Sequence, residues 1–261
     1  MHILITGGNE GIGFQMVLQF LRDGHKVAVF DLNLDNLSAY KEQYGENLIF
    51  FECDISNGQA VMHSVNEVFS VFNGIDYAIH NACRYLLKSF EDTADDDYKS
   101  VYNVNYYGAI NLTRAVLPIM KKHSGGRFFY TCSVAGITGF AYDGAYASSK
   151  AALESLAKCL NLEYQNEGIT FHIIHPPHTG TASVRRWTAT GGYMNDPEKV
   201  GIGLAKNIHK KKFIICYSFS HYLQIKTIYL FPTGWGRFLN TLANQKNDPI
   251  ALKDRNKKQE N

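Results

Sequence analysis

Tyr146 and Lys150 stand four residues apart and could transfer a proton together. On a helix, residues at this spacing lie about one turn apart on the same face. The phenol of a free tyrosine has a pKa near 10, and a neighbouring ammonium group favours its phenolate form. Lowering that pKa by about three units takes about 4 kcal/mol and would let the phenol pass protons near neutral pH. The same spacing is compatible with an exposed helix face that does no chemistry.

Ser133 adds a hydroxyl group thirteen residues before Tyr146, just after the apolar run at 127–131. A hydroxyl at the end of a strand could hold a substrate oxygen, and it could equally cap a turn or a helix. The sequence therefore offers an alcohol and a phenol that could act on one oxygen atom.

A glycine-rich segment, Thr6-Gly7-Gly8-Asn9-Glu10-Gly11-Ile12-Gly13, follows the first apolar run. Glycines let a backbone turn tightly and approach a pyrophosphate, and the N-terminus of the next helix offers free N–H groups to the anion. Glycines are common in loops, but these stand between a predicted strand and an amphipathic helix, as a dinucleotide site requires. The segment predicts a nucleotide-binding loop.

Asp31 stands 18 residues beyond Gly13, where the second strand is expected to end. A carboxylate at this place binds the ribose hydroxyls of the adenosine in dinucleotide-binding folds. It would repel a 2′-phosphate, as would Glu10, and neither position offers an arginine. NAD is therefore favoured over NADP. Asp54, after the third apolar run, could bond the adenine amino group or close a turn.

Short apolar runs that alternate with helical patterns predict the scaffold for these residues. The runs are His2–Thr6, Lys26–Phe30, Leu48–Glu52, Tyr77–His80, Arg127–Thr131, Thr170–Ile174 and Phe213–Cys216. Near-continuous apolar strands separated by helices indicate a parallel sheet covered on both faces. We expect an α/β fold, a Rossmann-type doubly wound parallel sheet of about seven strands, as a single catalytic domain over 1–243 with a polar tail over 244–261. Asp196-Pro197 should begin a helix.

Composition narrows the class of protein. The 26 basic and 24 acidic side chains give a net charge of +2, which does not suggest binding to nucleic acid. Five cysteines without C-x-x-C spacing argue against a disulfide framework or a zinc site and favour a reducing compartment. The first residues do not read as a signal peptide, and Lys226 interrupts the most apolar stretch, 213–231. We expect a cytoplasmic protein without a metal.

Taken in order over about residues 2–215, these motifs resemble the short-chain dehydrogenase/reductase family. The matching residues are Thr6-Gly7-x-x-x-Gly11-x-Gly13, Asp31, Asp54, Asn81-Ala82-Cys83 for the family's Asn-Ala-Gly, Asn105, Ser133, Tyr146, Lys150, and Pro176-Pro177-His178-Thr179-Gly180-Thr181 for its Pro-Gly stretch. Each motif alone occurs by chance, whereas the ordered set is specific.

The resemblance implies a role for each polar residue. Tyr146 would be the acid/base and Ser133 would orient the substrate oxygen. Lys150 would lower the pKa of Tyr146 and bind the nicotinamide ribose, and Asn105 would hold a water in a proton relay. The implied cofactor contacts are Gly7, Asn9, Glu10, Gly11, Ile12, Gly13, Asp31, Asp54, Ile55, Asn81, Ala82, Tyr146, Lys150, Pro176, Thr179 and Thr181. An alcohol and a ketone would be interconverted by hydride transfer with NAD.

Two departures from the family pattern lie near the nicotinamide end. Cys83 stands where the family has a glycine, so it adds a side chain close to the cofactor. Pro177 replaces another glycine and removes an N–H group. His175 and His178 flank the prolines and could line the pocket or lie in a polar loop. Neither departure replaces a catalytic group.

The substrate segment is expected at about 182–195, which contains Arg185, Arg186, Trp187 and Tyr193. Its aromatic residues suit a hydrophobic alcohol or ketone. The Pro-Pro-x-Thr-x-Thr motif also resembles that of the long-chain-base ketone reductases of the same family. Those enzymes prefer NADP, however, whereas Asp31 favours NAD.

The C-terminal stretch 217–243 has an aromatic helical face formed by Tyr222, Ile225, Ile228 and Tyr229. Such a segment can pack on the domain, pair with a subunit, or make peripheral membrane contact. The family resemblance also implies a homodimer or homotetramer through the helices that carry Asn105 and Tyr146.

Three functions remain open at this point. They are an NAD-dependent oxidoreductase, a membrane-peripheral lipid-ketone reductase, and a non-catalytic NAD-binding regulator or scaffold. The complete set of Asn105, Ser133, Tyr146 and Lys150 argues against the last, because a regulator does not need that chemistry.

Overall fold

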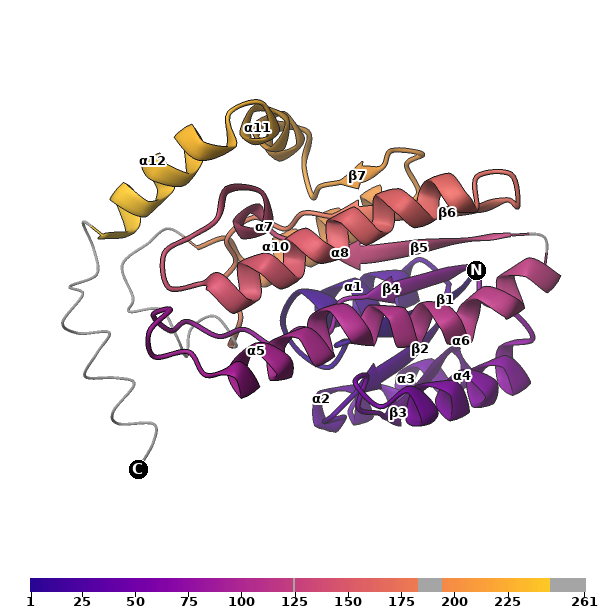
Figure 1. The fold of residues 1–261 in the computed structure, drawn as a ribbon. Helices are drawn as coiled ribbons and strands as arrows, with labels where there is room; N and C mark the ends of the chain where they lie inside the picture. Colours follow the sequence, from indigo (N-terminus) through magenta and orange to yellow (C-terminus); the bar gives the residue numbers. More distant parts are fainter. Residues whose placement is uncertain (124, 183–193, 245–261) are drawn as a thin grey trace.

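A seven-stranded parallel sheet organises the chain, as a computed structural model of residues 1–123, 125–182 and 194–244 shows (Figure 1). The strand order is β3-β2-β1-β4-β5-β6-β7. The strands are β1 His2–Thr6, β2 Lys26–Asp31, β3 Leu48–Glu52, β4 Tyr77–His80, β5 Gly126–Thr131, β6 Ile169–Ile174 and β7 Ile214–Ile215. The predicted α/β fold with a doubly wound sheet is therefore confirmed.

Apolar side chains on the strands alternate between two cores, one on each face of the sheet. In β1, Leu4 packs into one core, whereas Ile3 and Ile5 pack into the other. Both faces are covered, so strands such as β1 are buried along most of their length and read as continuous apolar runs. This is why seven short runs in the sequence predicted the sheet.

Helices cover each face of the sheet. Helices α4 Gly58–Phe72, α6 Gly108–Lys122 and α8 Gly144–Glu163 contribute to one core, and α1 Gly11–Arg22 and α10 Pro197–Asn207 to the other. The remaining helical segments are α2 Asp35–Ser38, α3 Lys41–Tyr44, η1 Gly45–Asn47, α5 Asp95–Tyr102, the π-helix η2 Asn103–Tyr107, α7 Val134–Thr138, α11 Phe219–Leu230 and α12 Pro232–Asn244. Asp196 begins α10 as predicted, because its Oδ1 accepts the Glu198 N–H at 2.9 Å.

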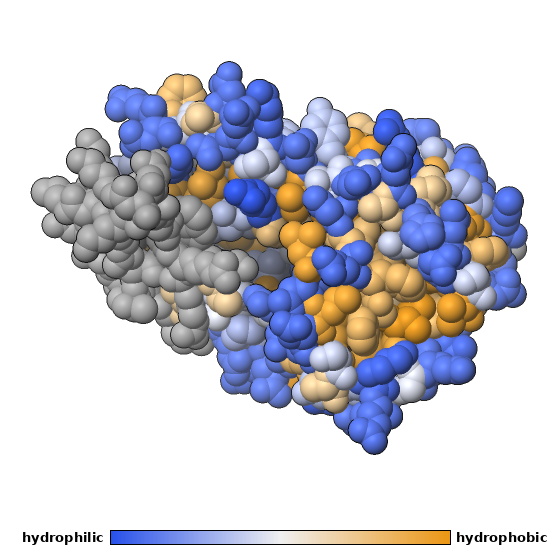
Figure 2. All heavy atoms as spheres, turned by 90° about the horizontal axis from the view of Figure 1, so that it is seen from below, coloured by the Kyte–Doolittle hydropathy of each residue, from blue (hydrophilic) through white to orange (hydrophobic). Residues whose placement is uncertain are grey.

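The edge strands are less regular than the central ones. Strand β7 is shorter than the predicted run 213–216, because only Ile214 and Ile215 pair with β6. At the opposite edge, Ile49, Phe50 and Phe51 of β3 are only half-buried. Figure 2 views the molecule from the side on which β3 lies in Figure 1, and hydrophobic residues reach the surface there.

The aromatic face predicted in the C-terminal stretch packs inward on the domain. Ile225 and Ile228 of α11 are buried with Cys216, and Tyr222 and Tyr229 are half-buried around them. No helix within the described ranges is long and apolar enough to cross a membrane. Most of the expected substrate segment 182–195 and the tail beyond residue 244, including Arg185, Arg186, Trp187 and Tyr193, lie outside the described residues.

Candidate active site

The predicted site residues gather where β1, β4, β5 and β6 end. Strand β1 lies between β2 and β4, so the chain crosses from one half of the sheet to the other between β1 and β4. Ligands of doubly wound sheets bind at such a switch point, outside the carboxyl ends of the strands. Topology thus brings together residues from four distant parts of the sequence.

The glycine loop packs closely against the segment after β4. Gly7 has φ +66°, and a Cβ atom there would lie 2.6 Å from Ala82 Cα. A Cβ atom on Gly13 would lie 2.1 Å from the Gly7 carbonyl oxygen, where the Asn81 Nδ2 also donates at 2.8 Å. Only glycine fits at both positions, so the loop can hold its tight turn beside α1.

The first turn of α1 presents an uncapped N-terminus. Glu10 occupies the N-cap position and is exposed, but its side chain makes no capping hydrogen bond. Gly11 has φ +58°, and a Cβ atom there would lie 2.9 Å from Thr181 Cγ2. Gly11, Ile12 and Gly13 therefore form a glycine-lined helix start opposite Thr181, which suits an anion such as a pyrophosphate.

Asp31 and Asn9 tie the glycine loop to the end of β2. Asp31 accepts the Asn9 N–H at 2.9 Å and the Leu32 N–H at 2.8 Å. The Asn9 side chain is buried and its Oδ1 accepts the Leu37 N–H at 3.2 Å. Asp31 therefore lies beside the loop, as predicted, with backbone donors on both of its oxygens.

A buried cluster around His80, which the sequence reasoning missed, joins β1 to β4. Thr6 Oγ1 accepts the N–H groups of Asn81 and Ala82, each at 3.1 Å. His80 contacts Thr6 Oγ1 at 3.2 Å and the Asn105 carbonyl oxygen at 3.1 Å. Burial and the nearby Lys150 lower the pKa of His80 to about 3, so its ring stays neutral. Asn81 and Ala82 are thus fixed from beneath.

Asn105 holds the segment after β4 rather than standing open to the site. Its Oδ1 accepts the Arg84 N–H at 2.8 Å, and its Nδ2 donates to the Arg84 carbonyl oxygen at 3.1 Å and to Ser149 Oγ at 3.0 Å. It lies in the π-helix η2, a local widening that often marks functional sites. Its side chain positions other groups, and the water-holding role stays a prediction.

Ser133, Tyr146 and Lys150 come together as the motif predicts. Lys150 is buried, and its Nζ donates to the Thr131 carbonyl oxygen at 2.7 Å and lies 5.6 Å from the centre of the Tyr146 ring. Ser133 Oγ accepts the Ala135 N–H at 3.2 Å and so caps α7. Its hydroxyl is also hydrogen-bonded to the Tyr146 phenol. The capping and substrate-side alternatives for Ser133 are therefore compatible.

The pKa of Tyr146 differs from the expectation. Burial raises the pKa of the Tyr146 phenol well above its usual value, and the neighbouring Cys83 and Asp143 raise it further. The hydroxyl of Ser133 acts in the opposite direction without reversing the shift. The expected lowering of the pKa is therefore wrong for this arrangement, in which the phenol is protonated at neutral pH.

Two further side chains that sequence reasoning missed border Tyr146. The Tyr85 ring meets the Tyr146 ring edge-on, with 4.8 Å between their centres. Asp143 stands three residues before Tyr146 and is only 3% exposed, and its Oδ1 has no hydrogen-bond partner among the described residues. Burial raises the pKa of Asp143 to about 8. Its position just before the Tyr146 turn was the one signal available in the sequence.

Cys83 lies within this group, since its thiol interacts with Lys150 and Tyr146. Cys83 is exposed as a residue, and the loss of hydration on the protein side of its sulfur raises the pKa of the thiol. The replacement of a glycine by Cys83 thus adds a neutral thiol beside the phenol. The segment that carries it is tied to the opposite wall, because the Lys88 N–H donates to the Tyr142 carbonyl oxygen at 2.8 Å.

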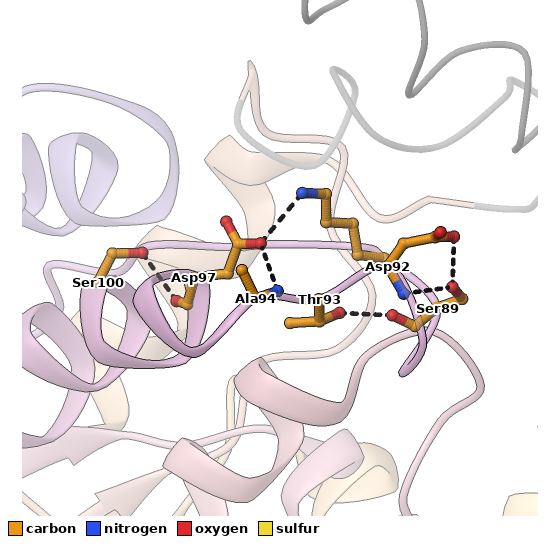
Figure 3. Close-up of polar contacts among 7 residues, drawn as sticks. Ser89, Asp92, Thr93, Ala94, Asp97 and Ser100 are labelled. Carbon is orange, nitrogen blue, oxygen red and sulfur yellow. Dashed lines mark hydrogen bonds and ion pairs between the residues drawn. The ribbon is translucent and has the colours of Figure 1, made fainter.

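Polar contacts fix the loop between Cys83 and α5 (Figure 3). Asp97 Oδ2 accepts the Ala94 N–H at 3.1 Å and pairs with Lys88 Nζ at 3.0 Å. Ser89 binds Asp92 and, through its carbonyl oxygen, the hydroxyl of Thr93. Loop and helix start therefore form one unit, which holds the wall of the site opposite α8.

The remaining predicted contacts have mostly local partners. Asp54 is exposed and accepts the N–H and the hydroxyl of Ser56, at 2.9 and 2.7 Å, so the turn alternative describes it here. Ile55 is buried, and its carbonyl oxygen accepts Asn111 Nδ2 at 3.0 Å. The cofactor contacts of both residues stay predictions.

Pro176, Thr179 and Thr181 lie in the segment after β6. Thr179 is buried and donates its hydroxyl to the Pro177 carbonyl oxygen at 2.7 Å. It also forms a bridge with Asn195, so the two ends of the expected substrate segment meet at the base. This segment therefore starts and returns beside the glycine loop.

His175 anchors α11 beneath the prolines. Its Nε2 lies 3.0 Å from the Tyr229 hydroxyl and 3.6 Å from Glu154 Oε2, and its carbonyl oxygen is 3.2 Å from His221 Nε2. Burial raises the pKa of Glu154, but hydrogen bonds from His175, Lys158 and Tyr229 outweigh it and lower the pKa to about 2. His175 is thus a buried structural group, and within the described ranges no three His, Cys, Asp or Glu side chains gather as a metal site.

Comparison with known proteins gives a consistent match. A family model described as short chain dehydrogenase matches residues 1–191. The chain is 31% identical over 191 residues to a 3beta-hydroxysteroid dehydrogenase of Mediterraneibacter gnavus, covering 72% of this chain and 69% of that protein. It is 24% identical over 247 residues to a 3-ketodihydrosphingosine reductase of Dictyostelium discoideum, covering 83% of this chain and 74% of that protein. A short-chain dehydrogenase from Streptomyces avermitilis has the same fold, with a TM-score of 0.74, 20% identity, and coverage of 95% and 98%.

Proposed function

Because this chain belongs to the short-chain dehydrogenase family of oxidoreductases, we propose that it interconverts an alcohol and a ketone on a lipophilic substrate, with NAD as the hydride carrier. The observation that carries this proposal is the grouping of Ser133, Tyr146 and Lys150 where β5 ends and α8 begins. A regulator without turnover would not need a phenol, a hydroxyl and an ammonium group around one point.

The glycine loop fits the pyrophosphate of a dinucleotide. A Cβ atom on Gly7 or Gly13 would collide with the backbone, and α1 begins without a side-chain cap. Gly7, Gly11 and Gly13 would hold the pyrophosphate, and Asp31 would lie at the adenosine ribose. Lys150 would bind the nicotinamide ribose. A bound nicotinamide supplies or accepts the hydride, that is, two electrons and one hydrogen nucleus.

The residues of the chain would handle the proton at the substrate oxygen. In ketone reduction the protonated Tyr146 phenol donates its proton to that oxygen while the carbon receives the hydride, and solvent later returns a proton to the phenolate. Ser133 donates a hydrogen bond to the same oxygen. Lys150, held by the Thr131 carbonyl oxygen, places a positive charge near the phenolate that forms. Alcohol oxidation runs these steps in reverse.

Two relatives support a lipophilic substrate. Their names refer to a hydroxysteroid and to a ketodihydrosphingosine, both lipids that carry an oxygen function on a hydrocarbon skeleton. The match to the second relative spans 83% of this chain. Tyr85 and Tyr146 add aromatic surface to the site. A hydrophobic ketone or secondary alcohol is therefore the substrate class to test first.

Tyr146→Phe tests the proposed reaction. The variant keeps the ring and its packing against Tyr85 but loses the hydroxyl that transfers the proton. In a turnover screen of steroid and long-chain ketones, we expect the rate to fall about 10²–10⁴-fold. Calorimetry should show unchanged NAD binding. Tyr44→Phe, in α3 and away from this site, is the matched control. Near-normal turnover of Tyr146→Phe would overturn the mechanism.

Asp31 carries the expected preference for NAD. Its carboxylate beside the glycine loop would repel a 2′-phosphate, and exposed Glu10 would add to the repulsion. Titration calorimetry should therefore give a lower Kd for NADH than for NADPH, and Asp31→Ala should narrow the difference. Equal affinities, or tighter NADPH binding to the wild type, would contradict the preference.

A further inference from the structure

Helix α11 is apolar on two opposite faces, of which only one is used by the domain. His221, Ile225 and Ile228 are buried. On the other side, Phe219 and Leu230 are 69% and 71% exposed, and Leu223 is also exposed. Residues spaced by 4 and 11 positions lie within about 40° of one another on a helix with 3.6 residues per turn. Phe219, Leu223 and Leu230 therefore form one outward stripe.

The same kind of surface continues into α12. Phe231, Phe238 and Leu242 are exposed and are spaced by 7 and 4 residues, so they also share one side of a helical path. We call Phe219, Leu223, Leu230, Phe231, Phe238 and Leu242 the apolar rim. A group of large exposed apolar side chains indicates a surface that binds another protein or a membrane.

Lysine side chains lie beside the α11 part of the apolar rim. Lys226 lies on the outward stripe of α11, and its Nζ is 5.8 Å from the centre of the Tyr222 ring. Lys212 lies 4.4 Å from the same ring, and Lys210, Lys212 and Phe219 line one shallow hollow. Between Glu198 and Asp248 the sequence has eight Lys or Arg residues and no Asp or Glu. The surface can therefore meet an anionic partner with little charge repulsion.

We propose that the apolar rim docks α11 and α12 onto the surface of an anionic lipid bilayer. Interfacial helices bind through buried apolar side chains together with lysines that reach anionic headgroups, and each basic residue near such a surface adds to the attraction. A second copy of the chain is a poorer occupant, because a two-fold contact would place this basic surface against itself. The aromatic face singled out in the sequence is not the docking face, since it packs on the domain.

The docking surface adjoins the candidate site. Helix α12 packs on α7, where a Cβ atom at Gly236 would lie 2.8 Å from the Thr138 carbonyl oxygen, and Asn240 Oδ1 accepts the Ala141 N–H at 2.8 Å. Residues 134–141 connect Ser133 to the start of α8. A docked molecule would thus hold the Ser133–Tyr146 wall next to lipid. Delivery of a lipophilic substrate from the bilayer rests on the proposed function, whereas the docking itself does not.

Vesicle sedimentation with the full chain tests the docking. We expect co-sedimentation with phosphatidylcholine vesicles that contain about 30% phosphatidylserine and not with pure phosphatidylcholine, and release at about 0.5 M salt. Phe219→Ser/Leu230→Ser should lower the partition at least about 10-fold. The matched control is Phe90→Ser/Val71→Ser, at positions 84% and 53% exposed elsewhere on the molecule, which should bind as the wild type does.

Three results would overturn the docking. The first is failure of the wild type to sediment with anionic vesicles, and the second is equal binding of both double variants. The third is a lower oligomer mass by light scattering for Phe219→Ser/Leu230→Ser than for the wild type and the control variant, which would assign the apolar rim to a second copy. No substrate or cofactor is present in the sedimentation. Its result is therefore independent of the Tyr146→Phe assay, and either hypothesis can fail alone.

Discussion

At the scale of single residues, Asp143 places a buried carboxyl group three residues before Tyr146, and ionisation of that group lowers the unfolding free energy. It is almost fully buried, and its Oδ1 makes no hydrogen bond within the part of the chain that the structure describes. Burial raises its pKa from 3.8 to about 8, so the folded chain keeps a proton that the unfolded chain releases between these values. Its contribution to stability is therefore present at low pH and declines as the pH rises.

Asp143→Asn should remove this pH dependence. From about pH 4 to pH 8 the wild type should lose about 1.4 kcal/mol of unfolding free energy per pH unit relative to the variant. Chemical denaturation at several pH values measures the difference. Asp95→Asn, in the exposed first turn of α5, serves as the control and should follow the wild type. A constant difference between Asp143→Asn and the wild type would show that the carboxyl group is ionised and solvated.

The sequence predicts Ser133, Tyr146 and Lys150 but not their surroundings. The spacing of these three residues can be recognised in the sequence without any knowledge of long-range contacts. His80 contacts Thr6 and the Asn105 carbonyl oxygen, which lie 74 and 25 residues away in the sequence. The contact of Tyr85 with Tyr146 forms only when the loop that carries Tyr85 packs on α8, so the sequence does not show it. For the same reason the pKa of Tyr146 could not be predicted, since burial decides its direction.

At the scale of elements, the strands were predictable because both faces of the sheet are covered. The bounds of β3 and β4 agree with the apolar runs, whereas β7 is limited to two residues by its register with β6. The sequence predicts one apolar face on α11, and that face packs inward. The outward stripe on α11 was missed, because a helix that is apolar on two sides shows no single amphipathic pattern.

The fit between the glycine loop and α1 gives a prediction at this scale. Gly13→Ala should lower the unfolding free energy by about 1–3 kcal/mol and weaken NAD binding, because its Cβ atom would meet the Gly7 carbonyl oxygen. Gly234→Ala, in α12 with no atom closer than 4.0 Å to the new Cβ, should instead stabilise the chain by up to about 1 kcal/mol. Denaturation and calorimetry compare the two. Similar effects of both substitutions would refute the close-packing argument.

At the scale of the whole molecule, we predict a homodimer or homotetramer. The helices that carry Asn105 and Tyr146 are the ones that the family resemblance assigns to subunit contacts. Tyr107 beside α6 and Leu162 near the end of α8 are large exposed side chains on this side of the sheet. Light scattering at micromolar concentration should give a multiple of 29.4 kDa, and Leu162→Asp should shift the mass toward one chain. A monomeric wild type would contradict the prediction.

The strand order also determines when the glycine loop can take its shape during synthesis. Strand β1 is synthesised first, but its second neighbour, β4, begins only at Tyr77. Until Asn81 and Ala82 arrive and bind Thr6, Gly7 lacks the backbone that lies against its Cα atom in the folded chain. Such long-range parallel pairing is slow, and it exposes apolar strands while it is incomplete. In a nascent chain the glycine loop therefore stays incomplete while about seventy further residues are translated. His175 obtains its partners later still, because Tyr229 and His221 belong to α11, near the C-terminal end of the domain.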